Sequence, residues 1–217
     1  METSRNLRRA LSLYVIPDRV IGAPLSLEEQ TRLALEGGAT AIQLRDKSMD
    51  GRELLAAARR MAGLCAASGA LFIVNDRLDV ALLSGADGVH LGQNDLPLSE
   101  ARKLIDSFRP SRSFLVGVSA HTASEAEQAE ADGAGYLGVG AAFDTGSKDG
   151  AKVIGLEGLR EVRMSTRLSC VAIGGITLEN LPEVMSTGVD GVSVISAAVR
   201  GDVRARVAAL KARLDAH

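Results

Sequence analysis

Short apolar runs alternate with longer amphipathic stretches along most of the chain. Leu71–Val74 is a run of the first kind, four apolar residues that end at the polar pair Asn75-Asp76. Residues 52–68 are of the second kind, because their apolar side chains recur at the three- and four-residue intervals of one helix face. Short apolar runs without alternation are typical of strands in a parallel sheet that is buried on both faces. The pattern therefore predicts strands and helices in alternation.

This alternation repeats eight times. Strands are expected at residues 12–16, 41–47, 71–76, 88–91, 114–119, 135–140, 170–173 and 191–195. Helices are expected at 26–36, 52–68, 78–84, 98–108, 122–132, 156–165 and 178–186, with a last one that ends near Leu214. Two of them begin at capping boxes, Ser26–Glu29 and Thr122–Glu125, in which the first and fourth side chains satisfy free backbone amides. Each strand–helix unit has about 27 residues, near the compact end for a barrel.

These units predict an α/β protein with the fold of a single (β/α)8 TIM barrel. We assign residues 1–217 to one barrel domain, with residues 1–10 as a candidate loose N-terminal extension. A weak repeat supports the assignment, since Gly85–Val89, Gly133–Tyr136 and Gly188–Val192 each leave a helix through glycine and enter a strand. The alternative is a doubly wound open sheet. It would leave edge strands, and none of the eight segments looks protected as an edge.

Composition narrows the classes of function. The chain is 46% hydrophobic but only 3% aromatic, so small aliphatic side chains must build its core. A net charge of −2 without a basic stripe argues against nucleic acid as a partner. The N-terminus lacks an apolar signal core and residues 11–16 are too few to span a bilayer, so we expect no membrane partner and a cytoplasmic protein. Cys65 and Cys170 lie in apolar runs, which indicates buried thiols in a reducing compartment.

The strand at residues 41–47 ends in a charged tip. Side chains alternate along a strand, so Gln43, Arg45 and Lys47 are expected on one face, with apolar neighbours on the other. If that face lines a barrel mouth, two cations lie close together and partly desolvated, which is costly unless an anion completes the site. A pyrophosphate would meet this requirement. The other interpretation is a solvated edge strand.

Carboxylates follow the next two strands. Asn75 and Asp76 end one strand and Asp95 follows its neighbour, so the two carboxylates can approach each other across the strand spacing of about 5 Å. A close pair either shares a proton or holds a cation. Opposite the two cations of the previous strand, we expect Mg²⁺ bridging the carboxylates to a pyrophosphate. The alternative for Asp76 is an ordinary helix cap.

The later strands end in residues suited to binding a phosphate. His90 lies inside its strand and is expected to be a hydrogen-bonded core residue rather than a base. Ser119 has no evident triad partners, which leaves a hydrogen bond to a ligand or an ordinary turn. The hydroxyl-rich segment 143–150 has the composition of a flap over a phosphorylated ligand, or of a solvated loop. Backbone amides at Gly174-Gly175 and Val194–Ser196 predict a monophosphate site opposite the pyrophosphate site.

Taken together, these motifs resemble the thiamine phosphate synthase family over residues 14–199, nearly the whole chain. The matching motifs, in order, are Gln43–Lys47, Val74–Asp76, Gly88–Asp95, Gly117–His121, Thr145–Lys148, Ile173–Ile176 and Val192–Ala197. Each is short, but their number and order are specific. The flap departs from the family pattern, because Asp144 stands where a proline is usual, which affects flap closure and substrate affinity.

The resemblance implies a transferase of thiamine biosynthesis with two phosphorylated small-molecule substrates. An aminopyrimidine methyl pyrophosphate would be joined to a thiazole phosphate, giving thiamine phosphate and pyrophosphate. By resemblance, the pyrimidine substrate is held by Gln43, Arg45, Lys47, Asn75, Ser119 and Lys148. The thiazole phosphate is contacted by Thr145, Ser147, Gly175, Ile195 and Ser196. Asp76 and Asp95 bind the Mg²⁺ cofactor. A homo-oligomer is left open.

The expected mechanism is a dissociative substitution. Arg45, Lys47 and Lys148, with Mg²⁺, would stabilise charge on the leaving pyrophosphate, so no protein nucleophile is needed. One alternative is a thiazole tautomerase, which would have little use for the acidic pair or for both cations. Another is a non-catalytic barrel that senses a phosphorylated ligand.

Overall fold

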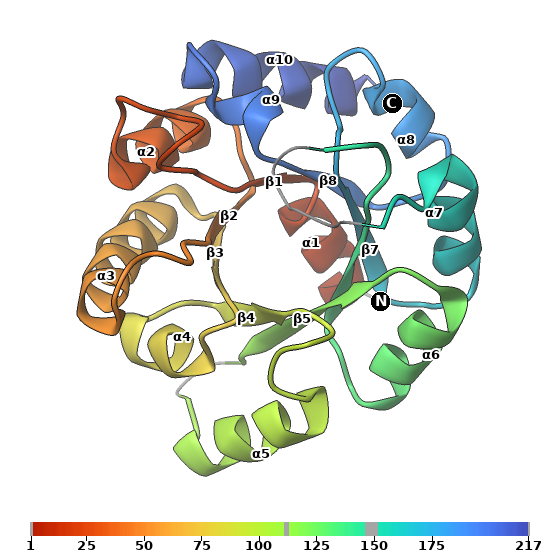
Figure 1. Cartoon of the computed structure of the whole chain (residues 1–217), viewed down its shortest axis with the longest axis horizontal. Coiled ribbons are helices and arrows are strands. Elements are labelled where there is room, and N and C mark those ends of the chain that lie inside the picture. Colours follow the sequence, from red (N-terminus) through yellow and green to blue (C-terminus); the bar gives the residue numbers. More distant parts are fainter. Residues whose placement is uncertain (1, 111–112, 146–151, 217) are drawn as a thin grey trace.

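The chain forms a closed barrel of parallel strands in a computed structural model that describes residues 2–110, 113–145 and 152–216. Figure 1 shows the barrel end-on, with helices around its outside. The strands are β1 (Leu13–Val15), β2 (Ala41–Leu44), β3 (Leu71–Asn75), β4 (Gly88–Leu91), β5 (Leu115–Ala120), β6 (Tyr136–Gly140), β7 (Ser169–Ile173) and β8 (Gly191–Val194). The helices are α1 (Glu2–Ala10), α2 (Leu27–Glu36), α3 (Gly51–Ser68), α4 (Leu78–Ser84), α5 (Leu98–Phe108), α6 (Ala123–Ala131), α7 (Gly155–Met164), α8 (Leu181–Met185), α9 (Ser196–Val199) and α10 (Val203–Asp215).

Closure of the sheet confirms the TIM barrel and rules out the doubly wound alternative. Strand β1 pairs in parallel with both β2 and β8, so the sheet has no edge. Most side chains of the core lie between the strands and the surrounding helices, and a smaller cluster fills the barrel interior. That interior cluster is built from Leu11, Tyr14, Ala41, Ile73, Tyr136 and Val171. The two tyrosines are the polar members of this interior.

Local signals placed several helices correctly. Ser26 and Glu29 form the predicted capping box of α2, and Thr122 caps α6 by accepting from the backbone N–H of Glu125. Both cysteines are buried free thiols, as predicted, and burial raises the pKa of Cys65 to about 12. No helix in the described ranges is long and apolar enough to cross a membrane.

Apart from α1, whose residues were expected to form a loose extension, three elements differ clearly from the prediction. Strand β2 ends at Leu44 instead of Lys47, because the Asp46 carboxylate accepts from the backbone of Ser48 and Met49 and turns the chain. Helix α8 begins at Leu181, three residues after its predicted start. The preceding turn is held by the side chain of the N-cap residue Asn180, which accepts from the Thr177 backbone N–H and donates to the Gly175 carbonyl oxygen. The short helix α9 was not predicted at all.

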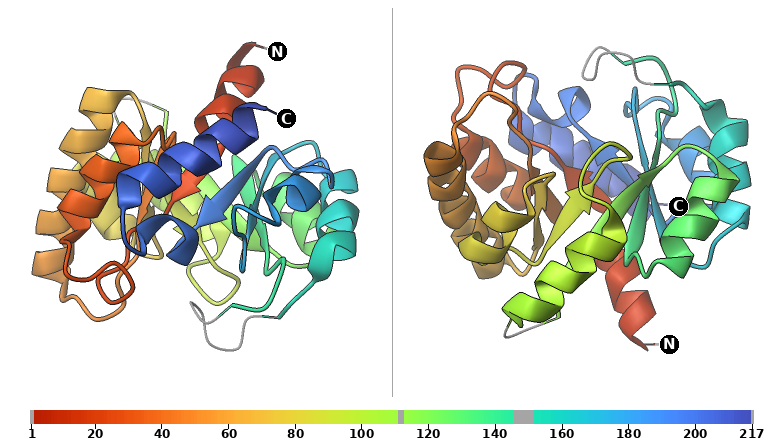
Figure 2. Two further views of the ribbon diagram at one scale, coloured as in Figure 1. Left: turned by 90° about the horizontal axis from the view of Figure 1, so that it is seen from above. Right: turned by 60° about the horizontal axis from the view of Figure 1, so that its bottom comes forward.

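The first residues form helix α1 at one end of the barrel. Figure 2 shows α1 projecting from the end opposite the loops that follow the strands. Leu7 packs against the interior cluster, and the Arg8 guanidinium lies 3.3 Å from the Asp190 carboxylate. These contacts cover the amino-terminal end of the barrel, so a ligand must enter from the carboxyl ends of the strands.

Candidate active site

A cavity opens at the carboxyl ends of the strands. Its walls come from every strand of the barrel and from the loops after β6, β7 and β8. The predicted site residues that line it are Gln43, Arg45, Asn75, Ser119, Thr145, Gly175, Ile195 and Ser196. Lys47, Asp76 and Asp95 lie outside the lining, at the rim that carries Arg45. Ser147 and Lys148 lie outside the described residues.

The loop after β2 carries the two predicted cations and is held by Asp46. One carboxylate oxygen of Asp46 accepts from Ser48 Oγ at 2.7 Å, and the other lies 2.7 Å from Arg19 Nε. Burial raises the pKa of Asp46, but hydrogen bonds from Ser48 and Met49 and the Arg19 charge outweigh it, so the pKa lies below its usual value. Arg45 is half-buried and Lys47 is exposed, because the strand ends before the alternation reaches Lys47.

Asp76 and Asp95 are brought together at the ends of β3 and β4. Burial, a side-chain hydrogen bond with Asp95 and the Asp95 charge raise the pKa of Asp76 to about 6, against an opposing effect of Lys47 and Arg45. The Asp95 carboxylate also accepts from the Gly92 backbone N–H at 2.7 Å. The acidic pair and the two cations therefore form one electrostatic group.

The backbone of Asp76 is unusual. Its φ is 61°, in the left-handed region, and its N–H donates to the His90 carbonyl oxygen at 2.8 Å. Such a conformation costs about 1–3 kcal/mol in a residue other than glycine, and it concentrates at functional sites. Asp76 does not cap α4, because Arg77 occupies the N-cap position and makes no side-chain cap hydrogen bond. The helix-cap interpretation of Asp76 is therefore wrong.

The acidic pair fits a divalent cation by its chemistry. The Asp95 charge raises the pKa of Asp76, and a cation between the two carboxylates would stabilise both in the charged form. No group of three metal-ligating side chains occurs among the described residues. Mg²⁺ binds readily through one or two carboxylates when substrate phosphates and water supply the other ligands.

The free energy of unfolding of the metal-free protein is expected to depend on Asp76 between pH 4 and 7. The pKa is raised from 3.8 to about 6 in the folded chain. The folded state therefore holds the proton more tightly, so this stabilisation is complete below pH 3.8 and is lost as the pH rises through 6. Asp76→Asn should remove that contribution. Urea denaturation of the parent and the variant at about pH 5 and about pH 7 measures this contribution. The same change of unfolding free energy with pH in both proteins would contradict the prediction.

A chain of hydrogen bonds crosses the barrel beneath the cavity. Gln43 Nε2 donates to the Tyr14 hydroxyl at 2.8 Å, and the Tyr14 and Tyr136 hydroxyls are 3.1 Å apart. Tyr136 contacts His90 Nδ1 at 3.1 Å, and His90 Nε2 lies 3.0 Å from Ser119 Oγ. His90 is thus hydrogen-bonded, as predicted. The expectation that Ser119 lacks a histidine partner is wrong. However, the group bonded to the other ring nitrogen of His90 is the Tyr136 hydroxyl, and not the carboxylate of a catalytic triad.

Glycines in two strands make room for the rings of this chain. A Cβ on Gly117 would lie 2.2 Å from Tyr136 Cζ, and one on Gly138 would lie 2.8 Å from His90 Cε1. Strand pairing brings these groups together, since Gly117 is in register with both Tyr136 and His90. The two rings are therefore accommodated by the sequence of their neighbouring strands.

Gly117→Ala is expected to destabilise the fold by about 1–3 kcal/mol, because the buried Tyr136 ring must move to admit the methyl group. Gly63→Ala is the matched control. Gly63 lies within α3 with nothing within 4 Å of an added Cβ, so alanine there should stabilise by about 0.5–1 kcal/mol. Urea denaturation of both variants measures the difference. Equal effects on the free energy of unfolding would contradict the crowding at Gly117.

The opposite rim is formed by the loops after β7 and β8. Gly174 and Gly175 have φ values of 99° and 64°, which glycine adopts without strain. Asn180 Nδ2 donates to the Gly175 carbonyl oxygen at 2.9 Å and holds this loop against the start of α8. Ile195 and Ser196 line the same side of the cavity. None of the described residues that line this side of the cavity carries a charged side chain.

Sequence reasoning missed four polar residues of the cavity wall, one of which is His121 in the loop after β5. Tyr14 and Tyr136 lie within strands and were assigned only to the sheet. Ser193 is buried on β8, and its Oγ has no hydrogen-bond partner in the part of the chain that the structure describes. Strand pairing places Ser193 beside Tyr14, a contact that closure of the barrel alone creates.

Comparisons of the sequence and of the fold with known proteins point to one family. The profile of a family described as thiamine monophosphate synthase matches residues 13–198. A Coprothermobacter proteolyticus protein named thiamine-phosphate synthase is 50% identical over 199 residues, 92% of each chain. One of the same name from Methanoculleus marisnigri is 48% identical over 206 residues, 94% of this chain and 95% of that one. A solved structure named thiamine phosphate pyrophosphorylase, from Pyrococcus furiosus, has a TM-score of 0.88 at 43% identity and covers 97% of this chain and 98% of its own.

Proposed function

The chain belongs to the thiamine monophosphate synthase family, and we propose that its barrel mouth holds two phosphorylated substrates at opposite rims. One is an aminopyrimidine methyl pyrophosphate and the other is a thiazole phosphate, and the products are thiamine phosphate and pyrophosphate. The observation that carries this assignment is the grouping of Arg45 and Lys47 with the Asp76–Asp95 pair at one rim. The glycine loop after β7 faces it across the cavity.

The residues at the first rim are suited to a pyrophosphate leaving group. Arg45 and Lys47 supply positive charge where the C–O bond breaks and its electron pair moves to the pyrophosphate. Asp76 and Asp95 are the side chains that would hold Mg²⁺, which when bound neutralises part of that charge. Lys148 is assigned to the same task from the sequence. These groups lower the activation free energy for departure of the pyrophosphate without forming a covalent bond to the substrate.

The residues at the second rim are suited to holding the nucleophile. Gly175, Ile195 and Ser196 line the cavity there, and their backbone amides suit a phosphate group. Thr145 and Ser147 would complete this site. With its phosphate held, the thiazole can present its ring nitrogen to the pyrimidine methylene, where the new C–N bond forms after the pyrophosphate has departed with the C–O electron pair. We place this reaction in the cytoplasm, since both thiols are free and buried.

The test is a reaction of purified protein with both substrates and Mg²⁺. Thiamine phosphate and pyrophosphate should appear together in equal amounts, and a chelator should stop both. A tautomerase would convert the thiazole phosphate alone and release no pyrophosphate. A sensor would bind the ligands without turnover. Either of these two results would overturn the proposal.

A further inference from the structure

The hydrogen bonds inside the barrel are compatible with one continuous direction, which starts at the Gln43 amide. Gln43 Nε2 donates to the Tyr14 oxygen, so the single Tyr14 proton is available for the Tyr136 oxygen. Tyr136 then has its own proton to give to His90 Nδ1. A neutral imidazole with an accepting Nδ1 carries its proton on Nε2, which donates to Ser119 Oγ. With the protons assigned in this way, every bond in the chain runs from Gln43 towards Ser119; the contacts of Tyr136 and His90 are also satisfied by the reverse assignment.

We infer that this polarised chain fixes which ends of the cavity accept and which donate hydrogen bonds. The Gln43 amide is held with Oε1 as an acceptor at the β2 wall, and the Ser119 hydroxyl is left as a donor at the β5 wall. Tyr14, Tyr136 and His90 are positioning residues for these two groups. The inference rests on the proposed function for its ligand, an aminopyrimidine, which offers an amino group to Gln43 and a ring nitrogen or phosphoryl oxygen to Ser119.

Burial keeps the chain intact. The Tyr14 and Tyr136 side chains are 2% and 0% exposed, so water does not compete for their hydroxyls. Burial raises the pKa of both tyrosines above the usual value, so each hydroxyl keeps the one proton that the chain requires. Gly117 and Gly138 leave room for the Tyr136 and His90 rings and no more. Rings packed in this way cannot turn to other partners without moving a strand.

The direction decides the role of Ser119. A serine nucleophile needs a base that accepts its proton, and here His90 Nε2 lies within hydrogen-bond reach of Ser119 Oγ. Because Tyr136 donates to Nδ1, the Nε2 position already carries a proton and cannot take another from Ser119. The pair therefore serves to orient the serine hydroxyl towards a ligand. The reversed chain, with a proton on Nδ1, would make Ser119 and His90 a catalytic dyad.

The tautomer of His90 distinguishes the two directions. NMR of the imidazole nitrogens in the isotope-labelled full chain reports it without any substrate, and His121→Gln helps to assign the signals of the three histidines. The expected result is a proton on Nε2 and none on Nδ1. A proton on Nδ1 would overturn the inference. Because no turnover is measured, this result stands or falls separately from the synthase activity.

Tyr136→Phe tests the effect on the ligand. Removing the hydroxyl frees the His90 tautomer, so KM for the pyrimidine substrate should rise about threefold to tenfold while KM for the thiazole phosphate stays within about twofold. Thr187→Val is the matched control, since it removes another buried hydroxyl, which donates to the Val184 carbonyl oxygen, far from the cavity. Equal changes of both KM values, or the same change in the control, would assign the tyrosine a purely structural role and overturn the inference.

Discussion

Arg45→Ala is expected to lower kcat/KM by about two to three orders of magnitude, because a guanidinium aimed at the leaving pyrophosphate acts where charge develops. The side chain is half-buried at the cavity wall and outside the packed core, so the free energy of unfolding should change by about 1 kcal/mol or less. Steady-state kinetics with both substrates, together with urea denaturation, measures the two effects. Activity within a few-fold of the parent would contradict the leaving-group role.

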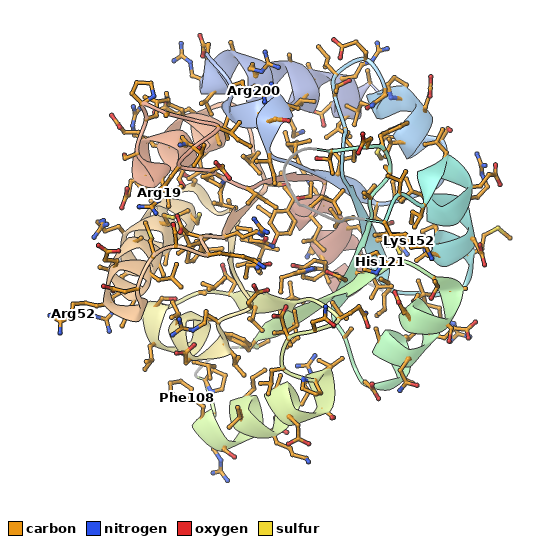
Figure 3. The ribbon with its side chains drawn as sticks, in the orientation of Figure 1. Arg19, Arg52, Phe108, His121, Lys152 and Arg200 are labelled. Atoms are coloured by element: carbon orange, nitrogen blue, oxygen red, sulfur yellow. The ribbon has the colours of Figure 1, made fainter. Side chains whose placement is uncertain are left out.

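The control for Arg45→Ala is Arg52→Ala, which removes the same charge from an arginine that points outward from α3 (Figure 3). It should leave kcat/KM within about twofold of the parent. A second readout is independent of turnover. Since Arg45 lowers the pKa of Asp76, its removal should raise that pKa further above 6, as followed by NMR of the carboxyl group. An unchanged pKa would place Arg45 too far from the acidic pair to share its ion.

Asp76→Asn and Asp95→Asn are each expected to lower Mg²⁺-dependent turnover about a hundredfold or more, because each removes one carboxylate ligand from the pair. A chelator should abolish the activity of the parent and added Mg²⁺ should restore it. Calorimetry of Mg²⁺ binding in the presence of pyrophosphate gives a readout apart from turnover. Both variants should bind the ion at least about tenfold more weakly.

Asp106→Asn is the control for the acidic pair, because Asp106 is an exposed carboxylate on α5. It should leave both turnover and Mg²⁺ binding unchanged. If all three variants bind the ion equally well, the divalent cation has another site. The raised pKa of Asp76 would then reflect only a shared proton between the two carboxylates.

The fold could be predicted because its strands and helices have opposite patterns. An uninterrupted apolar run such as Leu71–Val74 suits a strand covered on both sides, and the paired glycines after Glu36 end α2 where the prediction placed its end. Helix α1 escaped prediction because its arginine-rich sequence has only two apolar residues, Leu7 and Ala10. Its position depends on the closed barrel beneath it, which local periodicity does not describe.

The site could be predicted where polar residues stand at strand ends, and not where they lie inside the strands. Arg45 and Asp76 follow apolar runs and Asp95 lies in the loop after β4, so each could be noticed by itself. The bond between Tyr14 and Tyr136 joins residues 122 positions apart, and each tyrosine alone looks like a normal strand residue. The ion pair of Asp46 was missed for the same reason, since its partner Arg19 lies on another loop, whereas the turn itself is local and the predicted strand simply ran past it.

The ion pair between Arg19 and Asp46 has a consequence for how the protein binds its substrate. Asp46 binds Arg19, Ser48 and Met49 through contacts made within the folded chain, so the backbone that carries Arg45 and Lys47 is held by the fold itself. Their mutual repulsion is thus overcome by folding instead of by the incoming pyrophosphate. The loop after β2 can therefore receive a pyrophosphate without the entropy cost of ordering its backbone at that moment.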